Sequence, residues 1–313
     1  PTPLVGRAPL LAEITALLEQ PACQLLTLLG PGGIGKTHLA LAAATLAQAG
    51  FADGVCFITL ADVERLPGDD DGRGYLIGAL AGALQLSFDG QAVPEQQLAA
   101  FLHDKALLLL LDNFEPLIDV APFLATVLAA APQSKALVTS RERLNLQEEW
   151  LLTVESLTFP DELPPTLPTA QTVIDGLNAY SAVQLFVQCA RRVQPNFQLE
   201  ARNATAVGRI CQLVAGMPLG LTLAAAWVRH LACTEIVGEI EQTVDFLATS
   251  LRNTPARHRS MRAVFDYSWR LLNRAEQQAL AQLAIFPQPF SRQAAEAIAD
   301  CSFLTLCELV DKS

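Results

Sequence analysis

The most constraining feature of this sequence is the segment 30–37 (GPGGIGKT), which fits the pattern G-x-x-x-x-G-K-[ST] at every fixed position. Glycines allow backbone N–H groups to wrap around an anion, and a helix that follows adds its positive N-terminal end. An apolar run at 24–29 precedes the motif, and a helical pattern at 36–49 follows it. This context predicts a P-loop that binds phosphate groups, rather than a glycine-rich turn without a ligand.

The chemistry of a P-loop assigns roles to its residues. Lys36 is expected to reach the β- and γ-phosphates, and the Thr37 hydroxyl is expected to ligate Mg²⁺. The sequence therefore predicts a site for ATP or ADP with Mg²⁺. The other positions predicted to surround the phosphates are Gly30, Gly32, Gly33, Ile34, Gly35 and His38.

Short apolar runs alternate with helical patterns through the first half of the chain. Runs that are apolar on both faces and separated by helices predict an α/β fold, with a parallel sheet covered on both sides by helices. The predicted strands are 24–29, 55–60, 106–111, 135–139 and 150–154, and the predicted helices are 36–49, 75–86, 95–103 and 122–131.

Three charged residues follow predicted strands and are candidates for catalysis. Asp112 ends the run 106–111, where a buried strand delivers a carboxylate to the metal. Asn113 stands where many ATPases have a second acid, which indicates slow hydrolysis. Glu115 is the nearest carboxylate: it either activates water or is a surface residue at a helix start. Arg141 follows the strand 135–139, where it either reads the γ-phosphate or forms a surface salt bridge.

After residue 158 no strand pattern appears. Pro160, Pro164, Pro165 and Pro168 predict a linker over 159–175. Residues 176–250 are predicted to form a helical domain, and 251–313 contain further short helices. The predicted helices are 181–193, 203–215, 219–231, 234–247, 260–272, 274–284 and 292–299. The segment 67–74, with Asp69, Asp70 and Asp71, is predicted to be a solvated loop and not a metal site.

Charge and composition narrow the classes of protein further. A net charge of −11 argues against a general nucleic-acid surface, and residues 252–313 carry only 8 basic and 6 acidic side chains. Seven scattered cysteines without a CxxC pair are typical of a reducing compartment. The longest apolar stretch, 213–228, is interrupted by Gly216, Pro218 and Gly220. No membrane span or signal peptide is therefore predicted, and we expect a cytoplasmic protein that is part of a longer chain.

Six motifs together resemble the STAND ATPases, in particular the NB-ARC-like branch of bacterial regulators related to apoptotic protease activators and plant resistance proteins. The match extends over nearly the whole chain. The matching segments are 4–7 (LVGR), 29–37 (LGPGGIGKT), 110–115 (LLDNFE), 138–141 (VTSR), 216–219 (GMPL) and 261–287, which resembles the first half of a winged helix.

The resemblance implies a P-loop nucleotide-binding domain over 1–158, an all-α helical domain over 176–250 and a truncated winged helix over 251–313. It also implies that Val5, Gly6 and Arg7 border the adenosine and that Pro218 packs against adenine. In this family a histidine beyond the first part of the winged helix contacts the β-phosphate of ADP. No histidine follows His258 here, so this contact is expected to be absent.

The function implied by the resemblance is a nucleotide-dependent switch in signal transduction. ADP would favour a closed form, ATP would favour an open form that self-assembles into a homo-oligomer, and a weak ATPase activity would reset the switch. The expected partners are an upstream effector and a downstream sensor, neither of which is in this chain. Two alternatives stay open: a winged-helix DNA-binding transcriptional regulator that uses ATP, and a P-loop kinase, for which no lid or acceptor pocket is found.

Overall fold

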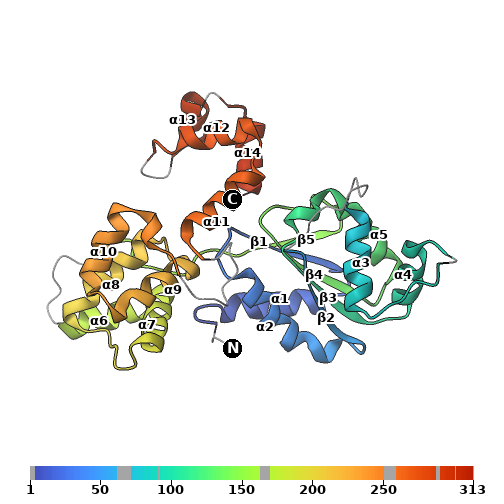
Figure 1. Ribbon diagram of the computed structural model, residues 1–313, viewed down its shortest axis with the longest axis horizontal. Helices are drawn as coiled ribbons and strands as arrows, with labels where there is room; N and C mark the ends of the chain where they lie inside the picture. Colours follow the sequence, from blue (N-terminus) through green and yellow to red (C-terminus); the bar gives the residue numbers. More distant parts are fainter. Residues whose placement is uncertain are drawn as a thin grey trace. The chain divides into compact units, whose positions relative to one another are not determined.

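A computed structural model describes residues 4–61, 72–90, 92–162, 170–249, 259–286, 290–299 and 301–312 (Figure 1). The chain divides into two compact units. Residues 7–30 and 36–154 form the α/β unit, whereas residues 1–6, 31–35 and 155–312 form the helical unit. Several positions singled out in the sequence lie outside the described residues: Asp69, Asp70, Asp71, Pro164, Pro165, Pro168 and His258.

The α/β unit contains a five-stranded sheet in the order β2-β3-β4-β1-β5, and every pair of neighbouring strands is parallel. All residues of β1 and β3 are buried, which explains why these strands are apolar without alternation. The strands are β1 (Leu25–Leu29), β2 (Gly54–Thr59), β3 (Leu107–Asp112), β4 (Lys135–Ser140) and β5 (Glu149–Thr153).

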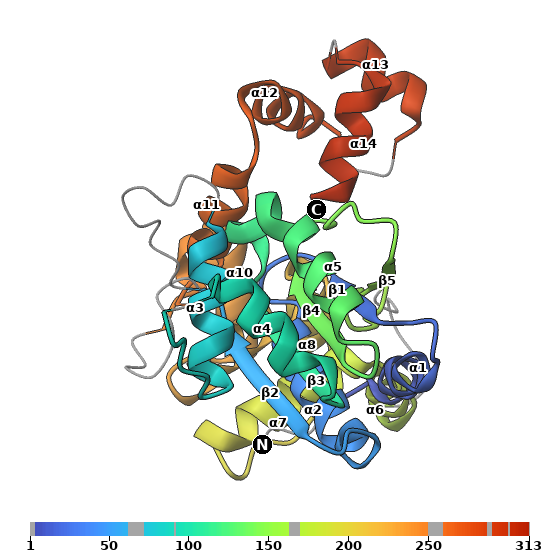
Figure 2. The same cartoon turned by 90° about the vertical axis from the view of Figure 1, so that its right-hand side faces the viewer.

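Helices cover both faces of this sheet. Leu109 and Leu111 of β3 and Val138 of β4 share one core with α3, α4 and α5. Figure 2 shows these three helices beside the sheet. On the other face, α2 contacts β3 and β4, and α1 packs against α2. The helices are α1 (Ala8–Glu19), α2 (Lys36–Ala47), η1 (Gln48–Gly50), α3 (Arg73–Ala83), α4 (Pro94–His103), η2 (Glu115–Val120) and α5 (Ala121–Ala130).

The first part of the helical unit is a bundle with its own apolar core. Phe186, Ile210, Leu221 and Ile236 are fully buried in this core, one from each of four helices. The elements are α6 (Ala170–Asn178), α7 (Ser181–Val193), α8 (Ala201–Leu213), α9 (Pro218–Ala226), η3 (Trp227–Arg229), α10 (Cys233–Gln242) and η4 (Val244–Phe246).

The second part of the helical unit consists of α11 (Met261–Leu271), α12 (Arg274–Leu283), α13 (Arg292–Ala299) and α14 (Phe303–Asp311). A small core joins α12, α13 and α14 through Ala279, Leu283, Ala295, Ala299 and Leu309. The Lys312 ammonium also donates to both carboxyl oxygens of the buried Glu276, at 2.8 and 3.0 Å. This second part of the helical unit therefore has packing of its own.

The predicted fold class is confirmed: a parallel α/β P-loop domain is followed by helical modules. Three helices were missed, namely α1, α6 and α14. The helix α6 begins at Ala170, so the prediction of a linker over 159–175 is wrong for its last residues. The prolines of that segment end at Pro168, and a proline just before a helix does not prevent the helix from forming. No helix in the described part of the chain is long and apolar enough to cross a bilayer.

Candidate nucleotide-binding site

The predicted P-loop connects the end of β1 to the start of α2. The Gly30 N–H donates to the Ser140 carbonyl at 3.3 Å, which fixes the start of the loop against the end of β4. Lys36 is the first residue of α2 and is 8% exposed, and its Nζ donates to the Gly30 carbonyl at 2.6 Å. Gly35 adopts a φ of +99°, which an L side chain rarely permits. The local geometry therefore requires the glycine-rich sequence.

Three oxygen-bearing side chains meet beside this loop. The Thr37 hydroxyl donates to Oδ1 of Asp112 at 2.6 Å, and the Thr139 hydroxyl donates to the same oxygen at 2.7 Å. Asp112 is the last residue of β3 and is 4% exposed. The parallel sheet thus brings its carboxylate next to the first turn of α2, although the two positions are far apart in sequence.

Glu115 and Arg141 form a buried pair at the same edge of the sheet. Their exposed fractions are 5% and 2%, and Arg141 Nε lies 3.9 Å from Glu115 Oε1. The second carboxyl oxygen, Oε2, is buried without a hydrogen-bond partner. The alternatives that Glu115 is a surface residue and that Arg141 forms a surface salt bridge are therefore wrong.

Burial shifts the pKa values of two charged groups in this site. Burial lowers the pKa of Lys36 to about 8, with Arg141 acting in the same direction and Glu115 and Asp112 opposing it. Burial also raises the pKa of Glu115, against the opposing charges of Lys36 and Arg141. The charged form of each group is thus disfavoured by the protein alone, which is typical of functional sites.

These residues fit a phosphate group with Mg²⁺. Thr37 and Asp112 supply a hydroxyl and a carboxylate side by side, and Mg²⁺ is usually held by one or two carboxylates together with phosphate oxygens and water. Within the described ranges, no group of three or more His, Cys, Asp or Glu side chains could hold a metal ion by itself.

Three of the remaining predicted residues, Val5, Gly6 and Pro218, belong to the helical unit. Val5 packs against the core of that unit. Gly6 has a φ of +68°, and a Cβ there would lie 2.4 Å from the Ser181 Cβ. Pro218 is half-buried in the first turn of α9. Their contacts with adenosine stay predictions.

Other predicted positions are distributed between the two units. Gly32 and Ile34 are buried within the loop tip, which belongs to the helical unit. The Gly33 carbonyl in that tip accepts a hydrogen bond from the Leu219 N–H at 3.2 Å. Arg7 is 8% exposed in the α/β unit, whereas His38 is exposed on α2. The contacts of Arg7 and His38 with the nucleotide stay predictions.

The sequence analysis did not identify Thr139 as a functional residue. It is 1% exposed and bonds both to Asp112 and to the backbone after it. The sequence shows a polar residue near the end of a buried apolar strand, but this residue is recognised as a neighbour of Asp112 only when the pairing of β3 with β4 is known.

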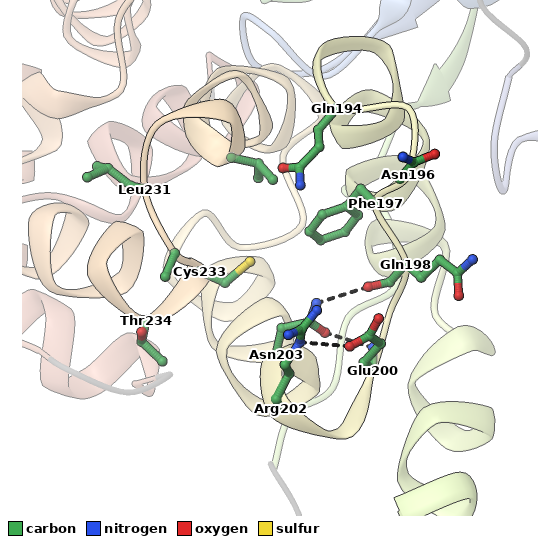
Figure 3. A pocket seen from close by; sticks show the side chains of 12 residues that line it. Gln194, Asn196, Phe197, Gln198, Glu200, Arg202, Asn203, Leu231, Cys233 and Thr234 are labelled. Atoms are coloured by element: carbon green, nitrogen blue, oxygen red, sulfur yellow. Dashed lines mark hydrogen bonds and ion pairs between the residues drawn. The ribbon is translucent and has the colours of Figure 1, made fainter.

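A cavity of about 340 Å³ lies in the helical unit, between the segments 194–203 and 228–234 (Figure 3). The Asn203 side chain bonds to the backbone of two other lining residues: its Oδ1 accepts from the Glu200 N–H at 2.9 Å, and its Nδ2 donates to the Gln198 carbonyl at 2.9 Å. Arg202 pairs with Glu200 at 2.7 Å. These contacts belong to the N-terminal cap of α8, and they do not indicate which ligand the cavity could bind.

Comparisons with known proteins extend the geometric evidence. No protein-family model matches the chain. Over 306 residues the chain is 34% identical to a Mycobacterium tuberculosis protein provisionally assigned as an HTH-type transcriptional regulator, with 95% of this chain and 31% of that protein covered. An uncharacterized protein of Mycobacterium tuberculosis is 29% identical over 298 residues, with 95% of this chain and 69% of the relative covered.

A solved structure gives a further likeness. A STAND protein with a tetratricopeptide repeat sensor from Pyrococcus horikoshii aligns with 100% of this chain and 39% of its own, at 16% identity and a TM-score of 0.45. The chain spans about a third of the length of the mycobacterial regulator. The P-loop between β1 and α2 and the Asp112 carboxylate at the end of β3 give the chain the fold of a P-loop nucleotide-binding domain.

Proposed function

We propose that the chain is an ATP- and ADP-binding switch for signal transduction, with a slow ATPase activity that resets it. The observation that carries this proposal is the convergence of Lys36, Thr37, Asp112, Glu115 and Arg141 at one edge of the sheet, beside the glycine-rich loop. Two cations and two carboxylates that are all more than nine-tenths buried are costly to maintain without a charged ligand. A nucleotide with Mg²⁺ is the ligand that these groups fit.

Each residue has a distinct role in binding. Lys36 would exchange its hydrogen bond with the Gly30 carbonyl for contacts with the β- and γ-phosphates. Thr37 and Asp112 would hold Mg²⁺, which neutralises charge on the phosphates when it is bound. The N–H groups at the start of α2 would bind phosphate oxygens, because this helix end carries a partial positive charge.

Slow hydrolysis follows from the residues that surround the nucleotide. Asn113 occupies the position after Asp112 and turns the chain with a φ of +65°, so no second acid follows directly. Glu115 would accept hydrogen bonds from the attacking water, but it is buried beside Lys36 and Arg141. Because burial raises the pKa of Glu115, the proposed slow rate rests on Asn113, whose amide cannot take a proton from the attacking water. The chain would therefore hydrolyse bound ATP slowly enough for the nucleotide to act as a signal.

The switch itself requires that ATP and ADP be distinguished. Arg141 is the residue placed to do so, because its guanidinium lies beside Glu115 at the edge where the γ-phosphate would sit. We propose that ATP favours an open form that self-assembles, and that ADP favours a closed form in which the P-loop, helical and winged-helix domains share the nucleotide. The proposed setting is the cytoplasm, with effector and sensor domains elsewhere in the whole protein.

Equilibrium binding of fluorescent ADP and of a fluorescent, slowly hydrolysed ATP analogue tests this proposal. Lys36→Ala should reduce the affinity for both at least 100-fold, whereas Lys105→Ala should leave it unchanged. Lys105 is a suitable control because it precedes β3, at the opposite end of the strands, and pairs with Asp53 at 2.9 Å. Light scattering should show larger particles with the ATP analogue than with ADP. Equal affinities of wild type and Lys36→Ala would refute the site, and equal particle sizes would refute the switch.

A regulator that binds DNA is the second candidate, and the name of the mycobacterial relative is the observation that favours it. The charge of the chain opposes direct binding by this segment, since residues 252–313 carry 8 basic and 6 acidic side chains within a chain of net charge −11. A mobility shift of duplex DNA by this chain that weakens steeply with salt would support the regulator. No shift at low salt would reject it.

A further inference from the structure

Thr139 connects the metal-binding carboxylate to the backbone that follows it. Its hydroxyl donates to Asp112 Oδ1 at 2.7 Å and accepts from the Asn113 N–H at 3.0 Å. The Thr139 carbonyl accepts from the Phe114 N–H at 3.0 Å. One residue of β4 thus binds three consecutive residues at the end of β3, which is the turn that carries Asp112.

The direction of these hydrogen bonds follows from their chemistry. A backbone N–H can only donate, so the Asn113 N–H occupies a lone pair of the Thr139 oxygen. The single hydroxyl proton is then directed to the Asp112 carboxylate. Thr37 donates to the same carboxyl oxygen at 2.6 Å, so both hydroxyls bond to Oδ1 and neither bonds to Oδ2.

We propose that Thr139 is a positioning residue for Mg²⁺, which orients the Asp112 carboxylate so that Oδ2 faces the metal or its bound water. This inference rests on the proposed nucleotide function. A hydrogen bond to one oxygen of a carboxylate fixes the rotation of the group, and such partners of metal ligands commonly change metal affinity about 10- to 100-fold when they are removed. Thr139 would thus act through Asp112 without touching the nucleotide.

The sheet itself provides a matched control. Thr27 lies on β1 in the same sheet and is fully buried, but its hydroxyl has no hydrogen-bond partner. Replacing either threonine by valine keeps the branched shape and nearly the same volume. Thr27→Val removes only an unpaired hydroxyl, whereas Thr139→Val removes the bond to Asp112 and the bond from the Asn113 N–H. Thr139→Ser retains the hydroxyl and should restore what Thr139→Val loses.

The test measures the affinity of the full chain for a fluorescent, slowly hydrolysed ATP analogue, with excess Mg²⁺ and with EDTA. In the wild type, in Thr27→Val and in Thr139→Ser, Mg²⁺ should strengthen binding by the same factor. In Thr139→Val that enhancement should fall at least about 10-fold, while the affinity in EDTA should stay within about twofold of the wild type. Thermal unfolding of each variant shows whether the fold is retained.

The outcomes separate this inference from the function on which it rests. An unchanged Mg²⁺ enhancement in Thr139→Val would overturn the positioning role, but nucleotide binding by the wild type would still support the proposed function. Equal losses with Mg²⁺ and with EDTA, not restored by Thr139→Ser, would also overturn it, because they indicate a general structural defect. Absence of nucleotide binding in the wild type would refute the proposed function itself.

Discussion

Replacing Lys36 by methionine should stabilise the nucleotide-free protein while abolishing nucleotide binding. Burial lowers the pKa of Lys36 from 10.5 to about 8. A shift of about 2.5 pH units corresponds to roughly 3 kcal/mol of unfavourable free energy for the charged form in the folded state. Methionine removes this cost but also loses the hydrogen bond from Nζ to the Gly30 carbonyl, which is worth about 1 to 2 kcal/mol. The expected net gain in stability is about 1 to 2 kcal/mol.

The same pKa shift sets the pH dependence of this effect. Between pH 8 and 10.5 the unfolded chain binds a proton at Lys36 that the folded protein has lost, so the stability of the wild type rises with pH in this window. The advantage of Lys36→Met should therefore be largest below pH 8 and should shrink towards pH 10. Lys105→Met removes a partly exposed lysine and should show neither effect.

Thermal unfolding followed by circular dichroism measures this prediction, after bound nucleotide has been removed enzymatically and by gel filtration. At pH 7 the Tm of Lys36→Met should exceed that of the wild type by roughly 2–8 °C for a unit of this size. Excess ADP should raise the Tm of the wild type only, since a ligand stabilises the state that binds it. A Tm at pH 7 equal to or below that of the wild type, or a difference that does not shrink by pH 9.5, would refute the reasoning.

Three further variants probe neighbouring contacts. Because burial raises the pKa of Glu115, ionisation of this residue should lower the stability of the wild type as pH rises above 4.5, and thermal unfolding of Glu115→Gln should lack this contribution. Parallel pH profiles of the two proteins would contradict it. Arg141→Ala should weaken binding of the ATP analogue at least about 10-fold and binding of ADP less than about twofold. Equal losses of affinity for the two nucleotides in titrations would show that Arg141 does not distinguish them through the γ-phosphate. Gly33 has a φ of +81°, and a Cβ there would lie 2.9 Å from the Leu219 Cβ, so Gly33→Ala should weaken nucleotide binding at least about 10-fold. Gly78 has open space around it, so Gly78→Ala should bind nucleotide normally. Retained binding in Gly33→Ala would contradict the prediction.

The strands and the core of the α/β unit were predictable because their patterns are local. The five predicted strands differ from the observed ones by about a residue at each end. For β1, β3 and β4 the reason is that apolar runs buried on both faces have sharp limits. The helix α1 was missed for the opposite reason. Its start has no side-chain cap, and it buries mainly Ile14 and Leu18, so the sequence there carries few helix-start signals.

The site was predictable only in part, because much of it depends on contacts between strands. The motif specified Lys36 and Thr37, and the strand pattern specified Asp112. The burial of Glu115 and its pairing with Arg141 depend on β3 and β4 lying side by side, which the sequence order does not state. Thr139 was missed because a threonine in a strand has an ordinary explanation in β propensity. Its hydrogen bonds to the Asp112 turn appear only when the register of β3 and β4 is known.

Identification of the nucleotide released from the purified protein tests the central claim most directly. The protein should be denatured without added nucleotide, and the supernatant should be separated by anion-exchange chromatography with absorbance detection. We predict close to one adenine nucleotide per chain, released as ADP or ATP from the wild type and absent from Lys36→Met. If the wild type releases no nucleotide and takes up none when ADP or ATP is added with Mg²⁺, the P-loop at 30–37 is not a nucleotide site and the proposed switch is refuted.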